Sequence, residues 1–177
     1  MAGLTRSANF IMSDLEFSEN KKQKYWSQEE ALINIQKYCA FQERCHKDVR
    51  YKLIEHCIYG DLLEEIISDL ISNNFLNEER FARAFTRGKF RMKQWGKNKI
   101  KAELKFRDVS PYCINESMKE IEDVDYINTL QLLIVKKDKT VSFKNKYDRL
   151  KKLSDFAVSK GYEYELINRV IHELEDE

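Results

Sequence analysis

The sequence predicts an all-α fold in which three tandem three-helix repeats stack into an elongated, curved body. Its 177 residues include one proline and five glycines, too few for the frequent turns of a β-sandwich or barrel. Hydrophobic residues make up 42% of the chain and recur with helical periodicity along most of it. A set of apolar and turn-forming positions also returns after about fifty residues, which is typical of stacked helical units.

The first 26 residues differ from the rest because they are mixed and polar. Their only apolar cluster is Phe10-Ile11-Met12, and Lys21-Lys22-Gln23-Lys24 is a short basic run. We therefore expect residues 1–26 to form a flexible or partly ordered N-terminal arm. The basic run is either simply solvated or, as an alternative, in contact with nucleic acid.

The first repeat is expected over residues 27–75. Ser27 and Glu30 have the spacing of a capping box, in which the serine hydroxyl accepts the Glu30 amide and the Glu30 side chain reaches back. The second helix should end at Gly60, and Asp61 is placed to cap the third.

The second and third repeats, 76–123 and 124–177, follow from the same pattern shifted along the chain. Marker positions of the first repeat find counterparts 51 residues later, and looser counterparts a further 52 residues on. Each repeat is expected to cover the open apolar face of its neighbour, with nine helices in all and with bending at short joints near Phe75-Leu76 and Asp123-Val124. The matched positions are Leu53 with Leu104, Gly60 with Pro111, Leu63 with Ile114, Ile67 with Met118 and Leu70 with Ile121, followed by Phe156, Leu166, Val170 and the turn residue Gly161.

Residues 80–107 form the most basic stretch of the chain. They contain eleven Lys or Arg and a single acid, Glu103, and so carry +10, whereas the whole chain carries +1 and the remainder therefore −9. Other sections also differ in charge: residues 27–79 carry −6, residues 136–152 carry +6 and residues 161–177 carry −5. Such a body would offer separate basic and acidic contact areas to a mixed partner.

Helical periodicity orders the charges inside this stretch. At 100° per residue, the apolar residues of one helix fall on one side and its arginines form a ridge on another. The next helix repeats the plan, and Gly96 between them can take the positive φ of a helix end. We interpret the ridges as a surface facing a polyanion, with two ordinary solvated faces as the alternative. The apolar residues are Phe81, Ala84, Phe85, Gly88 and Met92 in the first helix and Ile100 and Leu104 in the second; the cations are Arg80, Arg83, Arg87 and Arg91, then Lys97, Lys101 and Lys105.

Several classes of function find no support in the sequence. It has no Gly-rich phosphate loop, no nucleophile motif and no spaced set of carboxylates and histidines, so an enzyme is not expected. Its four cysteines include no C-x-x-C pair, and Cys45-His46 with His56-Cys57 matches no usual zinc spacing. No apolar run could span a bilayer and no signal peptide is evident, so we expect a cytoplasmic protein without cofactor or metal.

Two motifs in the basic stretch resemble a known family. The run Leu76-Asn77-Glu78-Glu79-Arg80-Phe81-Ala82 resembles the L-(D/N)-(D/E)-x-R-F-A signature of the RecX family of recombination regulators, and Gly96-x2-Lys99-Ile100-x3-Leu104 resembles its G-x2-(R/K)-I-x3-L element. The chain departs from the family at Cys45, where a serine is usual, and at Asp48-Val49 in place of Glu-Leu. The resemblance covers about residues 27–175 and is strongest at its centre.

The resemblance implies three tandem three-helix repeats and a partner, the RecA recombinase filament on DNA. Members of the family lie in the groove of that filament and curb its ATP hydrolysis, strand exchange and coprotease activity without being enzymes. A monomer that contacts single-stranded DNA is the corresponding expectation, and contact with double-stranded DNA stays open. A plain helical DNA-binding module that acts by competition for DNA is the alternative.

We predict two sets of functional residues in the basic stretch. For Arg80, beside Glu78 and Glu79, a structural ion pair and a binding role stay open, and for Trp95 packing is favoured over stacking on a base. The recombinase- or DNA-binding residues are expected to be Arg80, Arg83, Arg87, Arg91, Lys97, Lys99, Lys101 and Lys105; the structural motif residues are Leu76, Phe81, Ala82, Phe85, Gly96, Ile100 and Leu104.

Overall fold

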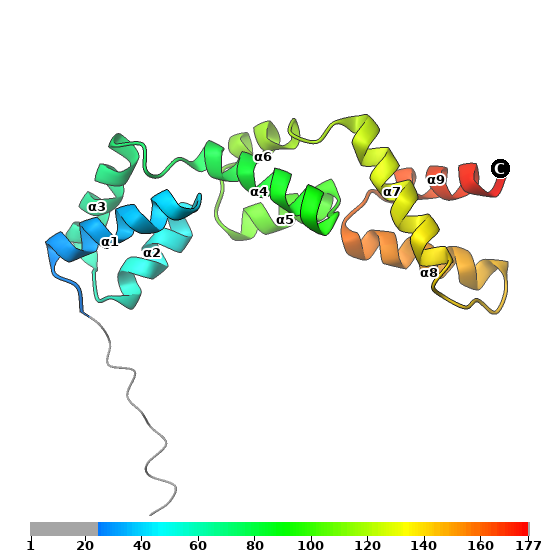
Figure 1. Cartoon of the computed structure of the whole chain (residues 1–177), viewed down its shortest axis with the longest axis horizontal. Helices are drawn as coiled ribbons and strands as arrows, with labels where there is room; N and C mark the ends of the chain where they lie inside the picture. The colour runs from blue at the N-terminus through cyan, green and yellow to red at the C-terminus, as the bar shows by residue number, and fades with distance from the viewer. Residues whose placement is uncertain (1–24, 177) are drawn as a thin grey trace, which may run out of the picture.

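A computed structural model describes residues 25–176 of the protein (Figure 1). Within that range the secondary structure consists of nine α-helices without a strand, which confirms the all-α prediction. The apolar cluster Phe10-Ile11-Met12 and the basic run at residues 21–24 lie outside the described residues. None of the helices in residues 25–176 has the length and apolarity needed to span a bilayer.

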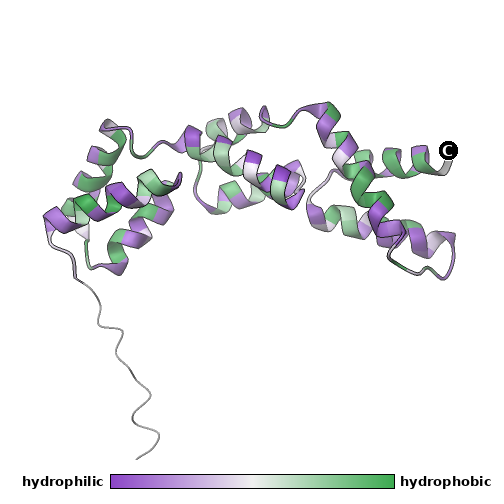
Figure 2. Cartoon of the chain, in the orientation of Figure 1, coloured by the Kyte–Doolittle hydropathy of each residue, from purple (hydrophilic) through white to green (hydrophobic). Residues whose placement is uncertain are grey.

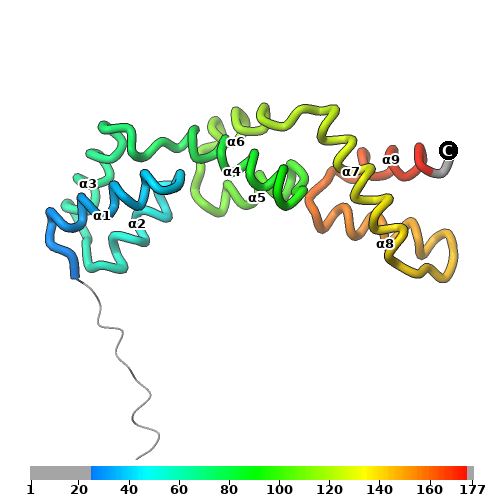
Figure 3. The backbone as a smooth tube through the Cα atoms, viewed as in Figure 1, coloured from blue at the N-terminus to red at the C-terminus, as the bar shows by residue number. Residues whose placement is uncertain are grey.

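The helices follow one another in three groups that form an elongated row, as the backbone tube shows (Figure 3). We refer to α1–α3 as the first unit, α4–α6 as the middle unit and α7–α9 as the third unit. As domain boundaries, residues 75/76 and 123/124 stay a prediction. The helices are α1 Gln28–Phe41, α2 His46–Glu55, α3 Gly60–Ser72, α4 Glu78–Lys93, α5 Lys97–Phe106, α6 Pro111–Met118, α7 Asp123–Asp138, α8 Lys146–Lys160 and α9 Tyr164–Asp176.

The first unit confirms the predicted capping box and corrects a second cap. The Glu30 amide donates to Ser27 Oγ at 3.2 Å and the Ser27 amide donates to Glu30 Oε2 at 3.0 Å. Gly60 does take a positive φ, +59°, but it is the first residue of α3, and Tyr59, not Asp61, is the N-cap. The chain thus reaches α3 through a left-handed turn that Gly60 makes without steric cost.

Each helix carries hydrophobic and hydrophilic residues together, as its colouring shows (Figure 2). The buried side chains form two clusters. One holds the core of the first unit, including Ile35, Leu53 and Leu70. The other runs through both the middle and the third unit. These two units therefore share one core, whereas the first unit has its own.

The predicted apolar face of α4 was wrong in part. Its buried residues are Phe81, Ala82, Thr86 and Phe90. Thr86 Oγ1 donates to Ser117 Oγ of α6 at 3.0 Å, which satisfies both buried hydroxyls because Ser117 in turn donates to a carbonyl. Met92, by contrast, is 80% exposed. Of the predicted face, Phe81 is buried and Phe85 packs half-buried against the core cluster, whereas the end of the face at Met92 is open to solvent.

Two glycines bring the middle and third units into backbone contact. A Cβ on Gly96 would lie 2.2 Å from the Gly161 carbonyl oxygen, and one on Gly161 would lie 2.6 Å from the Lys99 amide nitrogen. Gly96 has φ −73°, so the expected positive φ was wrong, and the left-handed residue at this helix end is Gln94. Glycine is required at residue 96 because two backbones approach closely there.

Candidate functional site

The start of α4 explains the residues of the first family motif. Asn77 Oδ1 accepts the Arg80 amide at 2.8 Å and so caps the helix. Glu78 Oε2 accepts the Ser110 hydroxyl at 2.6 Å, which ties α4 to the start of α6. Leu76, Phe81 and Ala82 are buried, as predicted. The motif therefore builds the entry to the middle unit.

Arg80 joins the first unit to the middle unit. Its Nε donates to Glu43 Oε1 at 2.6 Å, and its two terminal nitrogens donate to the Asn74 side chain and backbone at 2.9 and 3.0 Å. The acid that it pairs with lies in the turn after α1, not among its neighbours Glu78 and Glu79. This geometry supports the structural role that the sequence left open for Arg80.

Other ion pairs cross the same boundary, which we call the first junction. Arg107 of the middle unit donates to Asp48 Oδ1 at 3.2 Å, and Lys47 of the first unit contacts Asp108 Oδ2 at 3.0 Å. The Lys47 ammonium also donates to the Phe106 carbonyl at 2.7 Å. Polar contacts of this kind dominate the junction, although Cys45 of the first unit belongs to the core cluster of the other two units.

Cys45 caps α2 in place of the usual serine. Its Sγ accepts the Asp48 amide at 3.3 Å, and the side chain is 1% exposed. Burial raises the pKa of this thiol, so it stays protonated at neutral pH. The departure from the family pattern thus keeps the cap and adds an apolar atom to the core.

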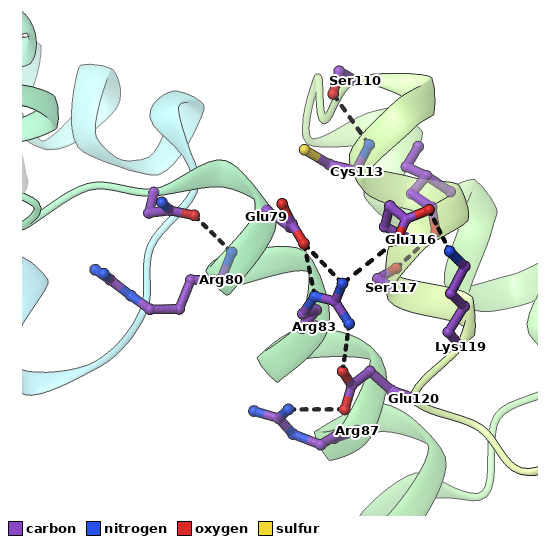
Figure 4. A network of polar contacts seen from close by, with 12 residues as sticks. Glu79, Arg80, Arg83, Arg87, Ser110, Cys113, Glu116, Ser117, Lys119 and Glu120 are labelled. Carbon is purple, nitrogen blue, oxygen red and sulfur yellow. Dashed lines mark hydrogen bonds and ion pairs between the residues drawn. The ribbon is translucent and has the colours of Figure 1, made fainter.

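Arg83 and Arg87 are also engaged inside the protein (Figure 4). Both guanidinium groups donate to the Glu120 carboxylate at 2.8 Å, one to each oxygen, and Arg83 also binds Glu79 at 2.8 Å. The bonds from Arg83 and then Arg87 lower the pKa of Glu120. These two arginines of the predicted ridge therefore clamp α4 to the segment after α6.

Two lysines of α5 face the third unit. The Lys97 ammonium contacts Asp123 at 2.8 Å, and the Lys99 ammonium donates to the Ser159 carbonyl at 3.0 Å. Lys89 and Lys99 both place their ammonium groups 4.9 Å from the centre of the Trp95 ring. Trp95 is half-buried against the larger core cluster, which agrees with packing as its role.

The basic stretch is thus divided by its contacts. Within residues 25–176, no ion pair or hydrogen bond from the side chain is found for five of its cations: Lys89, whose ammonium lies over the Phe85 and Trp95 rings, and four others from the end of α4 and from α5. That the eight predicted residues bind a partner stays a prediction. Three of the eight make no such contact in the described part of the chain and remain the better candidates. Lys93, which the sequence reasoning missed, joins them. Lys93 follows the Arg80–Arg91 ridge but falls on another side of the helix, so periodicity gave no signal for it. The four others are Arg91, Lys93, Lys101 and Lys105.

Two models of known protein domains match the middle and third units. The family model described as the second three-helix domain of RecX matches residues 77–118, and that of the third three-helix domain matches residues 123–171. Together they span just over half of the chain. The chain belongs to the RecX family. The RecX models match the middle and third units, the two that share one core.

Relatives and solved structures agree with this placement. A protein of Clostridium perfringens called regulatory protein RecX is 32% identical over 133 residues, which are 74% of this chain and 62% of that protein. One from Bacillus cereus with the same name is 27% identical over 150 residues, or 84% of this chain. This match spans only 55% of the Bacillus cereus protein, so the chain covers little more than half the length of that relative.

The crystal structure of RecX from Lactobacillus salivarius superimposes with a TM-score of 0.75 at 22% identity. It covers 84% of this chain and 96% of the other. A second crystal structure, of regulatory protein RecX, gives the same TM-score at 16% identity. At identities this low, the TM-scores establish a shared fold alone, and this fold agrees with the predicted helical-repeat body.

Proposed function

We propose that this chain is a non-enzymatic regulatory protein that binds the RecA recombinase assembled on DNA and restrains its ATP hydrolysis, strand exchange and coprotease activity. Membership of the RecX family is the observation that carries the proposal, together with the relatives named as regulatory proteins. We place the protein in the cytoplasm as a monomer, with recombinase contact primary and DNA contact secondary.

The charge layout supports a mixed partner made of protein and nucleic acid. The first unit is acidic, whereas the middle unit keeps Arg91, Lys93, Lys101 and Lys105 without ion pairs in the described part of the chain. Cations that no internal acid neutralises can replace the counterions of phosphate groups. Arg83 and Arg87 are less suited to this task because Glu120 already binds both.

The direct test is a titration of the protein into RecA on single-stranded DNA, with ATP turnover as the readout. We expect hydrolysis to fall at protein concentrations well below that of RecA, because a groove-bound regulator acts on many subunits of a filament. Unchanged hydrolysis and unchanged strand exchange at saturating protein would overturn the proposal.

A general DNA-binding module is the second candidate, and the four unpaired cations are the observation that favours it. It predicts strong binding to bare DNA at physiological salt, with a slope of log affinity against log salt near −0.7 per phosphate contact on single strands. It also predicts no binding to DNA-free RecA, whereas the regulator should retain that binding.

Charge reversal can separate the two candidates. In the variant Lys101→Glu with Lys105→Glu, DNA affinity should fall more than tenfold and the salt slope should shrink, while binding to DNA-free RecA should persist. Lys146→Glu on the third unit is a matched control at a distance from the middle unit. If DNA affinity and inhibition of RecA fall by the same factor in the double variant, competition for DNA accounts for the effect on RecA.

A further inference from the structure

A cleft of about 520 Å³ opens between the first and middle units. One wall comes from the turn between α1 and α2, and the other from α4. Ala84, Phe85, Gly88 and Met92 supply the apolar part of the α4 wall. A Cβ placed on Gly88 would find nothing within 4 Å, so the helix backbone is accessible at that point.

Of this apolar strip, Phe85 is half-buried and packs against the larger core cluster, whereas Ala84, Gly88 and Met92 do not belong to that cluster. The core side of α4 is filled by Ala82, Thr86 and Phe90, which are buried. Met92, at the end of the strip, is 80% exposed. An apolar stripe left open beside a complete core is a feature of surfaces that bind another molecule.

Two arginines, Arg44 and Arg107, contribute positive charge to the lining of the cleft. Their Nε–H groups are covered by the protein and have no hydrogen-bond partner in the described part of the chain. Both guanidinium groups lie over aromatic rings, 4.0 Å from the centre of the Tyr38 ring for Arg44 and 5.4 Å from that of Phe85 for Arg107. The nearby acids Glu43 and Asp48 are already bound by arginines at the first junction.

Unneutralised lysines add to this positive character. The Lys89 ammonium lies 5.0 Å from the centre of the Phe85 ring and makes no ion pair in the described part of the chain. Lys93, one turn further along α4, is exposed and also lacks an ion pair there. The cleft therefore combines an apolar wall with donors and positive charge.

We propose that this cleft binds an acidic peptide segment that also carries apolar side chains, contributed by the protein partner. The carboxylates of the segment would pair with Lys89 and Lys93, while its apolar side chain would lie between Phe85 and Met92. Gly88 leaves room for the segment to approach the backbone of α4. The inference rests on the proposed function, since it takes RecA as the protein that supplies the segment.

The combination of an apolar wall with lysines favours a peptide over nucleic acid as the occupant of the cleft. A phosphate backbone would use the lysines but would gain nothing from the aliphatic and aromatic wall of α4. An amphipathic segment uses both, as peptides do in grooves that combine apolar anchors with charge. Because the walls belong to two units, the bound segment would also fix their relative orientation.

The test fills the cleft without removing a charge. Gly88→Leu places a side chain in the open space and raises helix propensity, so the fold should persist. Asn128→Leu adds the same side chain to an exposed position of α7 and is the control. We expect Gly88→Leu to weaken binding to RecA on single-stranded DNA at least tenfold, whereas the control binds like wild type.

Failure of the inference and failure of the proposed function give different results. If wild type does not bind RecA or slow its ATP turnover, the proposed function fails. If wild type binds and Gly88→Leu binds equally well, with the folded signal of wild type in circular dichroism, the cleft proposal alone is overturned.

A photocrosslink identifies the occupant. Benzoylphenylalanine replaces Met92, and in the control it replaces Leu132, which is 67% exposed on α7. We expect the Met92 probe to crosslink to a segment of RecA that is rich in Asp and Glu. Crosslinks to residues 1–24 of this chain, to a second copy, to DNA or to a RecA segment without acids would each overturn the proposal.

Discussion

The first junction joins the first and middle units through ion pairs. The boundary between the middle and third units, which we call the second junction, is joined through backbone contact and buried tyrosines. At the first, Arg80 reaches Glu43, Arg107 reaches Asp48 and Lys47 reaches Asp108. Side-chain ion pairs that are partly exposed are weak and screened by salt. We therefore expect these ion pairs to restrain a rotation of the first unit only weakly.

At the second junction the backbones themselves are bonded. The Gly96 amide donates to the Lys160 carbonyl at 2.9 Å, and the Asn98 amide donates to the Gly161 carbonyl at 3.0 Å. Tyr126 Oη accepts the Lys97 amide at 2.9 Å and donates to Glu163 at 2.7 Å. Burial raises the pKa of Tyr126, which keeps its hydroxyl available as a donor.

Two joints of similar length thus differ in what they bury and bond, and we expect them to differ in stiffness. The sequence placed bending at both Phe75-Leu76 and Asp123-Val124. Because the middle and third units share one core, we expect them to move as a single body and the first unit to turn against it. The open cleft lies at the joint that we expect to move, so an occupant could select one orientation.

The largest expected effect is at the glycine contact. Gly96→Ala should destabilise the protein by about 3 kcal/mol, because the new methyl group would meet backbone atoms at 2.2–2.4 Å that cannot rotate away. Urea denaturation followed by circular dichroism measures the change. Gly88→Ala is the matched control and should stabilise by roughly 0.5–1 kcal/mol, because that site is open and helical. An equal change in the free energy of unfolding for the two variants would show that the close backbone approach does not require glycine at residue 96.

Tyr126→Phe should have the next largest effect at the second junction. It removes the hydroxyl that accepts the Lys97 amide and donates to Glu163, and loss of a buried partner costs about 1–3 kcal/mol. The same denaturation assay applies. Tyr112→Phe, at a tyrosine that is 67% exposed, should leave stability within about 0.5 kcal/mol of wild type. A Tyr126→Phe protein as stable as this control would argue against a rigid second junction.

Arg80→Gln should loosen the first junction while changing stability by only about 1 kcal/mol, because the ion pair with Glu43 is partly exposed. Small-angle scattering should show a broader distribution of overall dimensions, and high salt should broaden the wild type in the same direction. Lys119→Gln breaks an ion pair within the middle unit and should leave the dimensions unchanged. No change of scattering in the Arg80→Gln protein would contradict a hinge at this joint.

The smallest effect is expected inside the middle unit, which serves as a reference for both junctions. Hydrogen bonds from Arg83 and Arg87 lower the pKa of Glu120 below its usual 4.5. A carboxyl with a lowered folded-state pKa stabilises the fold above its unfolded pKa, and this contribution disappears as pH falls through the folded value. Glu120→Gln should therefore cost roughly 0.5 kcal/mol at pH 7, and the difference from wild type should shrink as pH falls through the folded pKa of Glu120, which lies below 4.5.

The measurement is a series of urea transitions between pH 7 and pH 3. Glu65→Gln, at an exposed carboxylate without an ion pair in the described part of the chain, controls for the loss of one charge. A pH-independent difference for Glu120→Gln would place its effect in packing, not in the arginine clamp.

Helical periodicity, caps and the shift of 51 residues predicted much of the fold. Ser27 and Glu30 announce a helix start by local chemistry, and the structure has both capping bonds. The counterparts Leu53 and Leu104 are both fully buried, in α2 and α5, so the repeat reflects equivalent positions. These features depend on neighbours within a few residues, or on a pattern that every unit must satisfy.

The candidate site was less predictable, since charge pairing depends on distant acids. The ridge of Arg80, Arg83 and Arg87 was visible in the sequence, but Glu43 and Glu120, which bind it, lie 37 and 33 or more residues away. Periodicity also marked Met92 as core although it is 80% exposed, because periodicity locates an apolar stripe without showing whether a partner helix covers it.

The sequence by itself determined that this protein would be helical, repetitive and strongly basic at its centre, because spacing and charge are properties of the chain. Only the tertiary structure decided which cations stay free, which glycine lets two units touch and which apolar stripe remains open. Those properties arise where segments far apart in the sequence meet, and a single helix contains no information about the group that will face it.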